Sequence, residues 1–151
     1  MEIVLNAILE ISSPDFENNG SMPVEFTCDG NNISPELKIG YLPSETKSLA
    51  LIMEDPDAPY GTFVHWIMWN VPPTDCIGKN CSPGLQGKNG KHETKYQGPC
   101  PPGGATHHYH FRVYALDKEL ELPFNTDKAD LIREMDGHIL GAGELIGTYK
   151  K

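Results

Sequence analysis

The sequence FVHWIMWNV occupies positions 63–71 and is followed at once by two prolines, Pro72 and Pro73. Its side chains are apolar except for His65 and Asn70. A short, continuous apolar run that ends in turn residues is typical of a strand with both faces buried. We therefore predict a buried central strand at 63–71 with a histidine in its middle.

Two further segments have the character of buried strands. Residues 48–53, SLALIM, form a second continuous apolar run. Residues 107–116, HHYHFRVYAL, alternate instead, with the apolar side chains on one face of the expected strand and histidine and arginine on the other. We expect these three strands to be central and adjacent in a mixed or antiparallel sheet.

The rest of the chain predicts shorter elements around this centre. Strands are expected at 3–11, 37–41 and 144–149, and the segment between Cys76 and Gly104 is expected to be mostly irregular. One helix is expected at 126–136, with Thr126 as its N-cap and Gly137 at its end, lying outside the sheet.

Many strands followed by a late helix indicate a mainly β protein, which we expect to be an antiparallel β-sandwich with one or two short peripheral helices. No repeat or linker divides the sequence, so residues 1–151 are expected to form a single domain.

The charge of the chain argues against several classes of partner. A net charge of -9 repels nucleic-acid phosphates and anionic lipid surfaces, so we expect no nucleic-acid partner. No apolar run approaches the ~20 residues of a membrane span, so no integral membrane contact is expected. The N-terminus has an acidic residue, Glu2, where a secretion signal carries positive charge. We therefore expect a cytoplasmic protein.

The four cysteines give no support for a zinc site, because none of them forms a C-x-x-C pair. Our principal expectation is that all four are free thiols in a reducing cytosol. The alternative is a pair between Cys76 and Cys81 across a loop in an oxidising compartment.

Polar residues accompany the predicted buried strands in three places. The sequence DPDAP occupies 55–59, His65 interrupts the apolar run, and GPCPPGG at 98–104 precedes the histidines of 107–108. Each has an ordinary structural explanation, namely a turn, a core histidine and a loop. Taken together, they can converge at one end of a sandwich, where loops and strand ends place functional sites.

These segments resemble the two hallmark motifs of the phosphatidylethanolamine-binding protein family. The turn at 28–35 and the final GTY at 147–149 are similar to its short bacterial and archaeal branch, called Raf kinase inhibitor-like. The resemblance implies packed antiparallel sheets with an anion pocket. It also implies that Pro56 or a proline of 99–102 is cis, and that a homodimer can form. For the dimer we expect Trp66 or Trp69 to be partly exposed.

The resemblance also implies a set of site residues, with no metal and no cofactor. These ligand-binding residues are Asp55, Asp57, His65, Pro101, His107 and Tyr109. A phosphate offers only acceptors, so the histidine rings, the tyrosine hydroxyl and backbone N–H groups near 103–104 are the expected donors. An aspartate can orient a histidine ring, and a second can meet an ammonium group. The expected ligand is therefore a small anion or zwitterion, such as phosphorylethanolamine.

Two alternatives remain open. Two histidines and two aspartates can serve a hydrolase, but the tight Asp55-Pro56-Asp57 turn aims its carboxylates apart and no nucleophile elbow is present. We therefore expect no enzymatic activity. The chain can also act as a protein-interaction module that inhibits a kinase or serine protease through the loop at 78–102, with or without the pocket.

Overall fold

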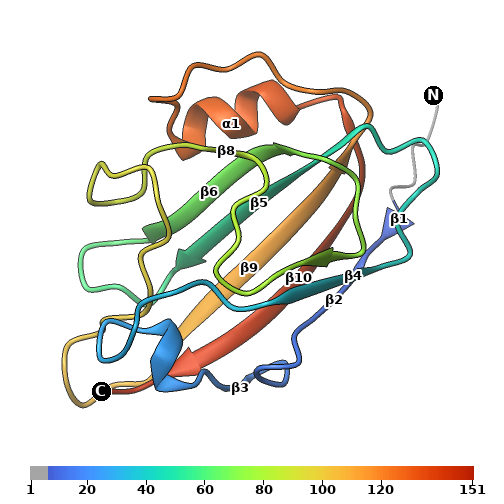
Figure 1. Cartoon of the computed structure of the whole chain (residues 1–151). Coiled ribbons are helices and arrows are strands. Elements are labelled where there is room, and N and C mark those ends of the chain that lie inside the picture. The colour runs from blue at the N-terminus through green and yellow to red at the C-terminus, as the bar shows by residue number, and fades with distance from the viewer. Residues whose placement is uncertain (1–6) are drawn as a thin grey trace, which may run out of the picture.

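Strand β5, Ser48–Asp55, lies at the centre of the larger of two sheets (Figure 1). It pairs antiparallel with β6, Phe63–Val71, on one side and with β9, His107–Leu116, on the other. All eight residues of β5 are buried. The prediction of three adjacent central strands is confirmed, and β5 continues two residues past the predicted end, so that Asp55 closes the strand.

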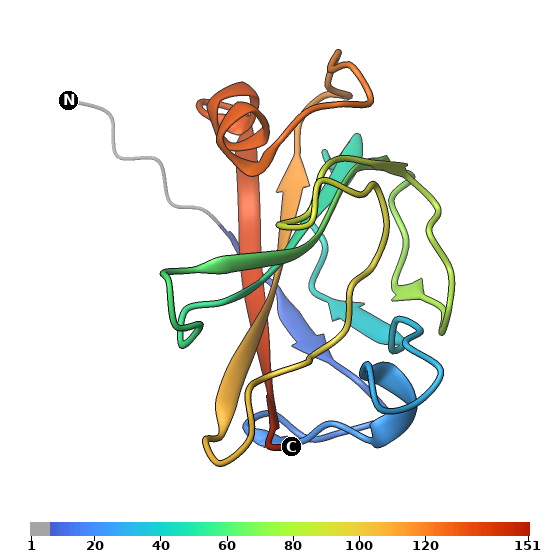
Figure 2. The same cartoon turned by 90° about the vertical axis from the view of Figure 1, so that its left-hand side faces the viewer.

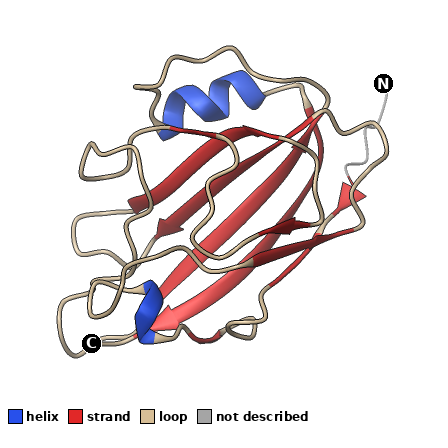
Figure 3. Ribbon diagram, viewed as in Figure 1, coloured by secondary structure: helices blue, strands red, loops and turns tan. Residues whose placement is uncertain are grey.

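The computed structural model describes residues 7–151 as two sheets, one α-helix and a short 3-10 turn (Figure 3). The larger sheet has the order β1-β10-β9-β5-β6-β8, with β3 also paired to β10, and the smaller one has the order β2-β4-β7. The remaining elements are β1 (Ala7–Ile8), β2 (Glu10–Ser12), β3 (Gly20–Ser21), η1 (Val24–Phe26), β4 (Leu37–Gly40), β7 (Cys76–Ile77), β8 (Leu85–Gln86), α1 (Lys128–Met135) and β10 (Ile139–Tyr149). The predicted mainly β class, with antiparallel sheets and little helix, is confirmed.

The core has two parts, one on each face of the larger sheet. The first lies between the two sheets, and Figure 2 shows β2 and β4 to one side of the long strands. The second lies on the opposite face, where Leu131 and Met135 of α1 pack with Ile67 and Trp69 of β6. Trp66 belongs to the first part of the core. It is 1% exposed, and Trp69 is fully buried. The expectation of a partly exposed tryptophan is therefore wrong.

The N-cap of the helix is Asp127, one residue later than the predicted N-cap, Thr126. The Asp127 side chain accepts a hydrogen bond from the Asp130 N–H at 2.9 Å, so Asp127 is the N-cap. The Thr126 hydroxyl instead donates to the Pro123 carbonyl at 2.6 Å. Gly137, with φ +83°, follows the helix in the left-handed conformation, as the predicted end requires.

The outer strands differ in length from the prediction. The predicted strand at 3–11 is two short strands, β1 and β2, and its positions 3–6 lie outside the described residues. The predicted strand at 144–149 is the second half of β10, which begins at Ile139. β10 pairs antiparallel with β9 and carries β1 and β3 in parallel along its other edge. In the described part of the chain, no helix is long and apolar enough to cross a membrane.

Candidate ligand-binding site

A cavity of about 260 Å³ opens where the end of β5 meets the beginnings of β6 and β9. The antiparallel pairing causes this meeting, since Asp55 is opposite Phe63 and Glu54 is opposite His110. Of the six site residues expected from the sequence, five line this cavity: Asp55, His65, Pro101, His107 and Tyr109. The sheet therefore brings together residues that are up to 54 positions apart in the chain.

His107 and Asp55 form a buried pair in the cavity wall. The Nδ1–H of His107 donates to Oδ2 of Asp55 at 2.7 Å, and Oδ1 of Asp55 accepts from the Asp57 N–H at 2.8 Å. The side chains are only 6% and 4% exposed. Because an ionised carboxylate can only accept, the pair fixes the proton of His107 on Nδ1. Nε2 of the ring has no hydrogen bond within residues 7–151 and is left for a ligand.

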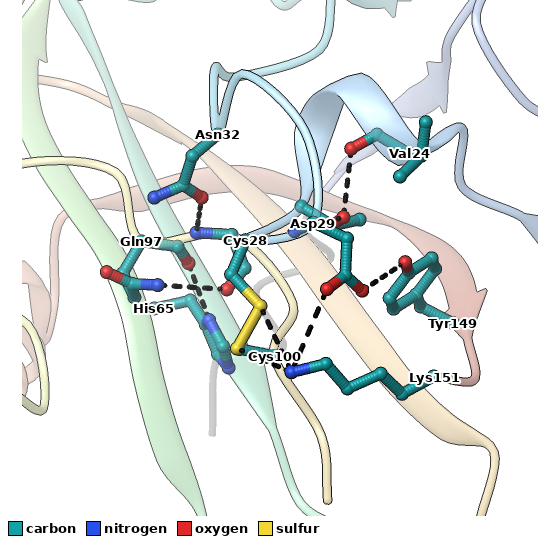
Figure 4. The surroundings of a disulfide bond; sticks show 11 residues. Val24, Cys28, Asp29, Asn32, His65, Gln97, Cys100, Tyr149 and Lys151 are labelled. Atoms are coloured by element: carbon teal, nitrogen blue, oxygen red, sulfur yellow. Dashed lines mark hydrogen bonds and ion pairs between the residues drawn. A yellow bond between two sulfur atoms is a disulfide. The ribbon is translucent and has the colours of Figure 1, made fainter. Parts of the chain in front are cut away.

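His65 is oriented by the main chain rather than by an aspartate. Its Nδ1–H donates to the Gln97 carbonyl at 2.6 Å (Figure 4). Burial lowers the pKa of His65, and this outweighs the Gln97 hydrogen bond and the charge of Asp55, which raise it. The ring is therefore neutral at pH 7, with a lone pair on Nε2. At neutral pH this nitrogen is therefore an acceptor, and donation from His65 to an anion, as expected from the sequence, stays a prediction for the protonated ring.

Tyr109 supplies a neutral donor beside His65. The two rings meet edge-on, with centroids 5.2 Å apart. Burial and the charge of Asp55 raise the pKa of Tyr109, so its phenol keeps the proton at any physiological pH. The hydroxyl makes no hydrogen bond to another described residue, which leaves its proton available to a ligand.

Asp57 is the expected site residue that the structure does not bring to the cavity. Its Oδ2 accepts from the backbone N–H of His108 at 2.9 Å and from the ring Nδ1–H at 2.8 Å. The side-chain hydrogen bond from His108 lowers the pKa of Asp57. Asp57 thus braces the start of β9 against the turn after β5. Gly103 and Gly104 are also exposed and do not line the cavity, whereas Gly98 does.

The loop after β8 closes the cavity and is tied to a distant turn by a disulfide. Cys100 lines the cavity with Pro101 and is bonded to Cys28, 72 positions away (Figure 4). The expectation of four free thiols is wrong for this pair, and so is the alternative, because Cys76 and Cys81 are both free. The Gly98 N–H also donates to Oδ1 of Asn32 at 2.8 Å.

Disulfides persist in oxidising compartments and also inside hyperthermophiles, so this bond is compatible with more than one compartment. No peptide bond within residues 7–151 is cis, so the expected cis proline at Pro56 or at 99–102 is wrong.

Eight lining residues are not among the expected site residues, and three of these lie outside the polar segments singled out in the sequence, namely Phe63, Lys91 and Gln97. Gln97 acts through its carbonyl, which no side-chain pattern reveals. Lys91 belongs to the segment predicted to be irregular, where a single lysine has no distinguishing pattern. Within the described residues, no group of three or more His, Cys, Asp and Glu side chains is arranged to hold a metal ion. Asp55 and His107 form a pair, and the absence of a metal stays a prediction.

Comparison with known proteins gives one consistent picture. The family model described as phosphatidylethanolamine-binding protein matches residues 12–150. A UPF0098 protein of Pyrococcus horikoshii is 44% identical over an alignment of 153 residues with gaps included. The alignment covers 95% of this chain and 77% of that protein.

Two solved structures are similar over nearly their whole length. The crystal structure of a phosphatidylethanolamine-binding protein homologue from Chlamydia trachomatis superposes with a TM-score of 0.92 at 38% identity, covering 97% of this chain and 99% of that one. Escherichia coli YbcL, described as a new member of the mammalian family, gives a TM-score of 0.87 at 25% identity, with 96% and 99% covered.

Proposed function

We propose that this chain, which belongs to the phosphatidylethanolamine-binding protein family, binds small phosphate-bearing ligands in the cavity beside His107. One observation carries the proposal: Nε2 of His107 and the hydroxyl of Tyr109 line the same cavity, and neither has a hydrogen-bond partner among the described residues. The buried carboxylate of Asp55 contacts the other ring nitrogen, Nδ1, at 2.7 Å.

The histidine pair suits a ligand that gains from a positive charge. An imidazolium donates from both of its ring nitrogens, and a carboxylate partner such as Asp55 stabilises a positive charge on the ring. A bound phosphate adds to this stabilisation because it places negative charge on the other side of the ring. Tyr109 gives a second donor that does not depend on pH in the physiological range.

His65 favours a ligand that carries a donor as well as an anionic group. Its neutral ring presents an acceptor, so a ligand that brings a donor to this side of the cavity gains a further hydrogen bond. The hydroxyl of a singly protonated phosphate can supply it, and so can the ammonium group of phosphorylethanolamine. A ligand with both acceptors and a donor therefore fits the three polar side chains better than one with acceptors alone.

The cavity limits the size of the ligand. Its volume of about 260 Å³ lies below the roughly 300–1,000 Å³ of pockets that enclose drug-sized molecules. Pro59, Phe63 and Pro101 make part of the wall apolar, which suits a short carbon segment next to the phosphate. A free headgroup fits this volume, and so does the phosphorylated side chain of a kinase or protease partner.

The arrangement favours binding without turnover. Both carboxylate oxygens of Asp55 already accept a hydrogen bond from the protein, which uses part of their capacity to activate a water molecule. Among the described residues, Cys100 is the one cysteine that lines the cavity, and it is held in a disulfide rather than presented as a nucleophilic thiolate.

Titration calorimetry with phosphorylethanolamine at pH 7 tests the proposal. We expect one site per chain in the wild type. The His107→Gln variant removes a hydrogen bond to a charged group, which contributes about 1.5–3 kcal/mol, so its affinity is expected to fall about 10- to 150-fold. Equal affinity in the two proteins would show that the cavity histidine is an ordinary core residue.

A further inference from the structure

We propose that Lys91 makes the cavity selective for the dianion of a phosphate monoester over singly charged anions such as a phosphate diester. This inference rests on the proposed function and names the ligand class for the same site. Lys91 suits this role because of its position at the cavity, the way its loop is held, and its place among the charged residues of the lining.

Lys91 is an exposed residue whose backbone position is fixed by a buried neighbour. Asn89 is only 4% exposed, and its Oδ1 accepts from the N–H groups of Lys91 at 2.8 Å and Glu93 at 3.1 Å. Nδ2 of Asn89 donates to the Lys95 carbonyl at 2.9 Å. The buried side-chain amide of Asn89 thus holds both ends of a tight loop, and it fixes the backbone position from which the Lys91 side chain extends.

The loop is also anchored to the strand that carries His65. The Gly90 N–H donates to the Val64 carbonyl at 2.8 Å. A Cβ atom at Gly90 would lie 2.5 Å from the ring of Phe63, so only glycine allows the loop to approach β6 this closely. Since Phe63 and His65 themselves line the cavity, this contact brings Lys91 to its rim.

Lys91 carries a positive charge that the described residues leave uncompensated. It forms no ion pair within residues 7–151, and in that part of the chain it is the one lysine or arginine that lines the cavity. The single acidic residue of the lining, Asp55, is paired with His107. The charge of Lys91 reaches the interior of the cavity, because after burial it is a further cause that lowers the pKa of His65.

A fixed charge discriminates between ligands by their own charge. The Coulomb energy between Lys91 and an anion is proportional to the charge of the anion, so a dianion gains twice the energy of a monoanion at the same place. In terms of affinity, the factor for the dianion is the square of the factor for the monoanion. Because the ammonium group is exposed and screened by solvent, we expect Lys91 to raise the affinity about 3-fold for the monoanion and about 10-fold for the dianion.

A pair of matched ligands tests this. At pH 8, methyl phosphate is a dianion, since its second pKa is near ~6, whereas dimethyl phosphate is a monoanion. By titration calorimetry we expect Lys91→Met to weaken methyl phosphate about 10-fold and dimethyl phosphate about 3-fold. Lys91→Arg keeps the charge and should stay within about 2-fold of the wild type. At pH 5, where methyl phosphate loses a charge, the effect of Lys91→Met should shrink to about 3-fold.

Lys88→Met is the matched control, because it removes the same charge from the same loop at a residue that does not line the cavity. An unchanged methyl phosphate affinity in Lys91→Met, or an equal loss in Lys88→Met, would overturn the role of Lys91 while leaving the proposed function intact. A wild-type protein that fails to bind methyl phosphate would instead contradict the proposed function itself.

Discussion

The Nδ1–H of His107 donates to Oδ2 of Asp55 at 2.7 Å, although the two residues are 52 positions apart in the chain. The contact exists because β5 ends beside the start of β9 in the antiparallel sheet. It leaves the other ring nitrogen of His107 available to a ligand, and it places the Asp55 carboxylate beside the ring. The proposed binding chemistry depends on this pair more than on any other contact in the molecule.

Replacing Asp55 should weaken ligand binding without unfolding the protein. In Asp55→Asn the amide keeps one acceptor but loses the charge that stabilises the histidine. We expect a loss of about 1–3 kcal/mol, or about 5- to 150-fold in affinity for phosphorylethanolamine by calorimetry. The control is Asp57→Asn, since Asp57 is exposed and contacts His108 instead of the cavity. Equal losses in both variants would mean that the turn, and not the pair, sets the affinity.

The buried His65 should make stability depend on pH. Above ~6.5 the ring is neutral in both the folded and the unfolded protein. Below this value the unfolded chain takes up a proton that the folded protein resists, because folding lowers the pKa of His65. The free energy of unfolding should therefore fall as the pH falls, by at most about 1.4 kcal/mol per pH unit from this residue.

Urea unfolding at pH 7.5, 6.5 and 5.5 measures this effect. The other histidines are present in both proteins, so the comparison of the wild type with His65→Gln isolates the contribution of His65. We expect a shallower dependence on pH in the variant. Parallel curves would indicate that His65 is protonated freely in the folded state.

The disulfide should stabilise both the fold and the cavity wall. The double variant Cys28→Ser/Cys100→Ser is expected to lose about 2–5 kcal/mol of unfolding free energy in urea. Its affinity for phosphorylethanolamine should also fall, because Pro101 follows the freed residue in the wall. Cys76→Ser/Cys81→Ser is the matched control, since both of these cysteines are exposed and free, and it should change stability by less than about 0.5 kcal/mol. An equal loss in the two double variants would be evidence against the bond.

The sequence predicts the centre of the fold well because the signal there is side-chain character. The apolar runs at 48–53 and 63–71 form buried strands. A strand with both faces covered removes adjacent apolar side chains from water, so a short continuous apolar run indicates such a strand. The beginning of β10 was missed because Gly141 and Gly143 contribute no side chains to a pattern. A Cβ atom at Gly143 would lie 2.3 Å from the Leu9 carbonyl oxygen, so the strand requires glycine at this position. Glycine is also the residue that removes the strand pattern from the sequence.

The candidate site was predicted in part for a similar reason. Asp55 ends β5, His107 begins β9 and His65 lies near the start of β6, so their convergence could be anticipated from the motifs. The Cys28–Cys100 pairing could not, since two cysteines 72 positions apart give no local pattern. The partner of His65 is the main-chain carbonyl of Gln97, which any residue would supply. An exposed lysine such as Lys91 becomes informative only once its loop is placed.

The most direct test of phosphate binding in this cavity is a crystal structure of the protein with phosphorylethanolamine. We predict the phosphate oxygens at about 2.7–3.0 Å from Nε2 of His107 and the hydroxyl of Tyr109, with a ligand donor facing Nε2 of His65. A phosphoryl group bound elsewhere on the molecule, or one that leaves Nε2 of His107 without a contact, would contradict the proposed site.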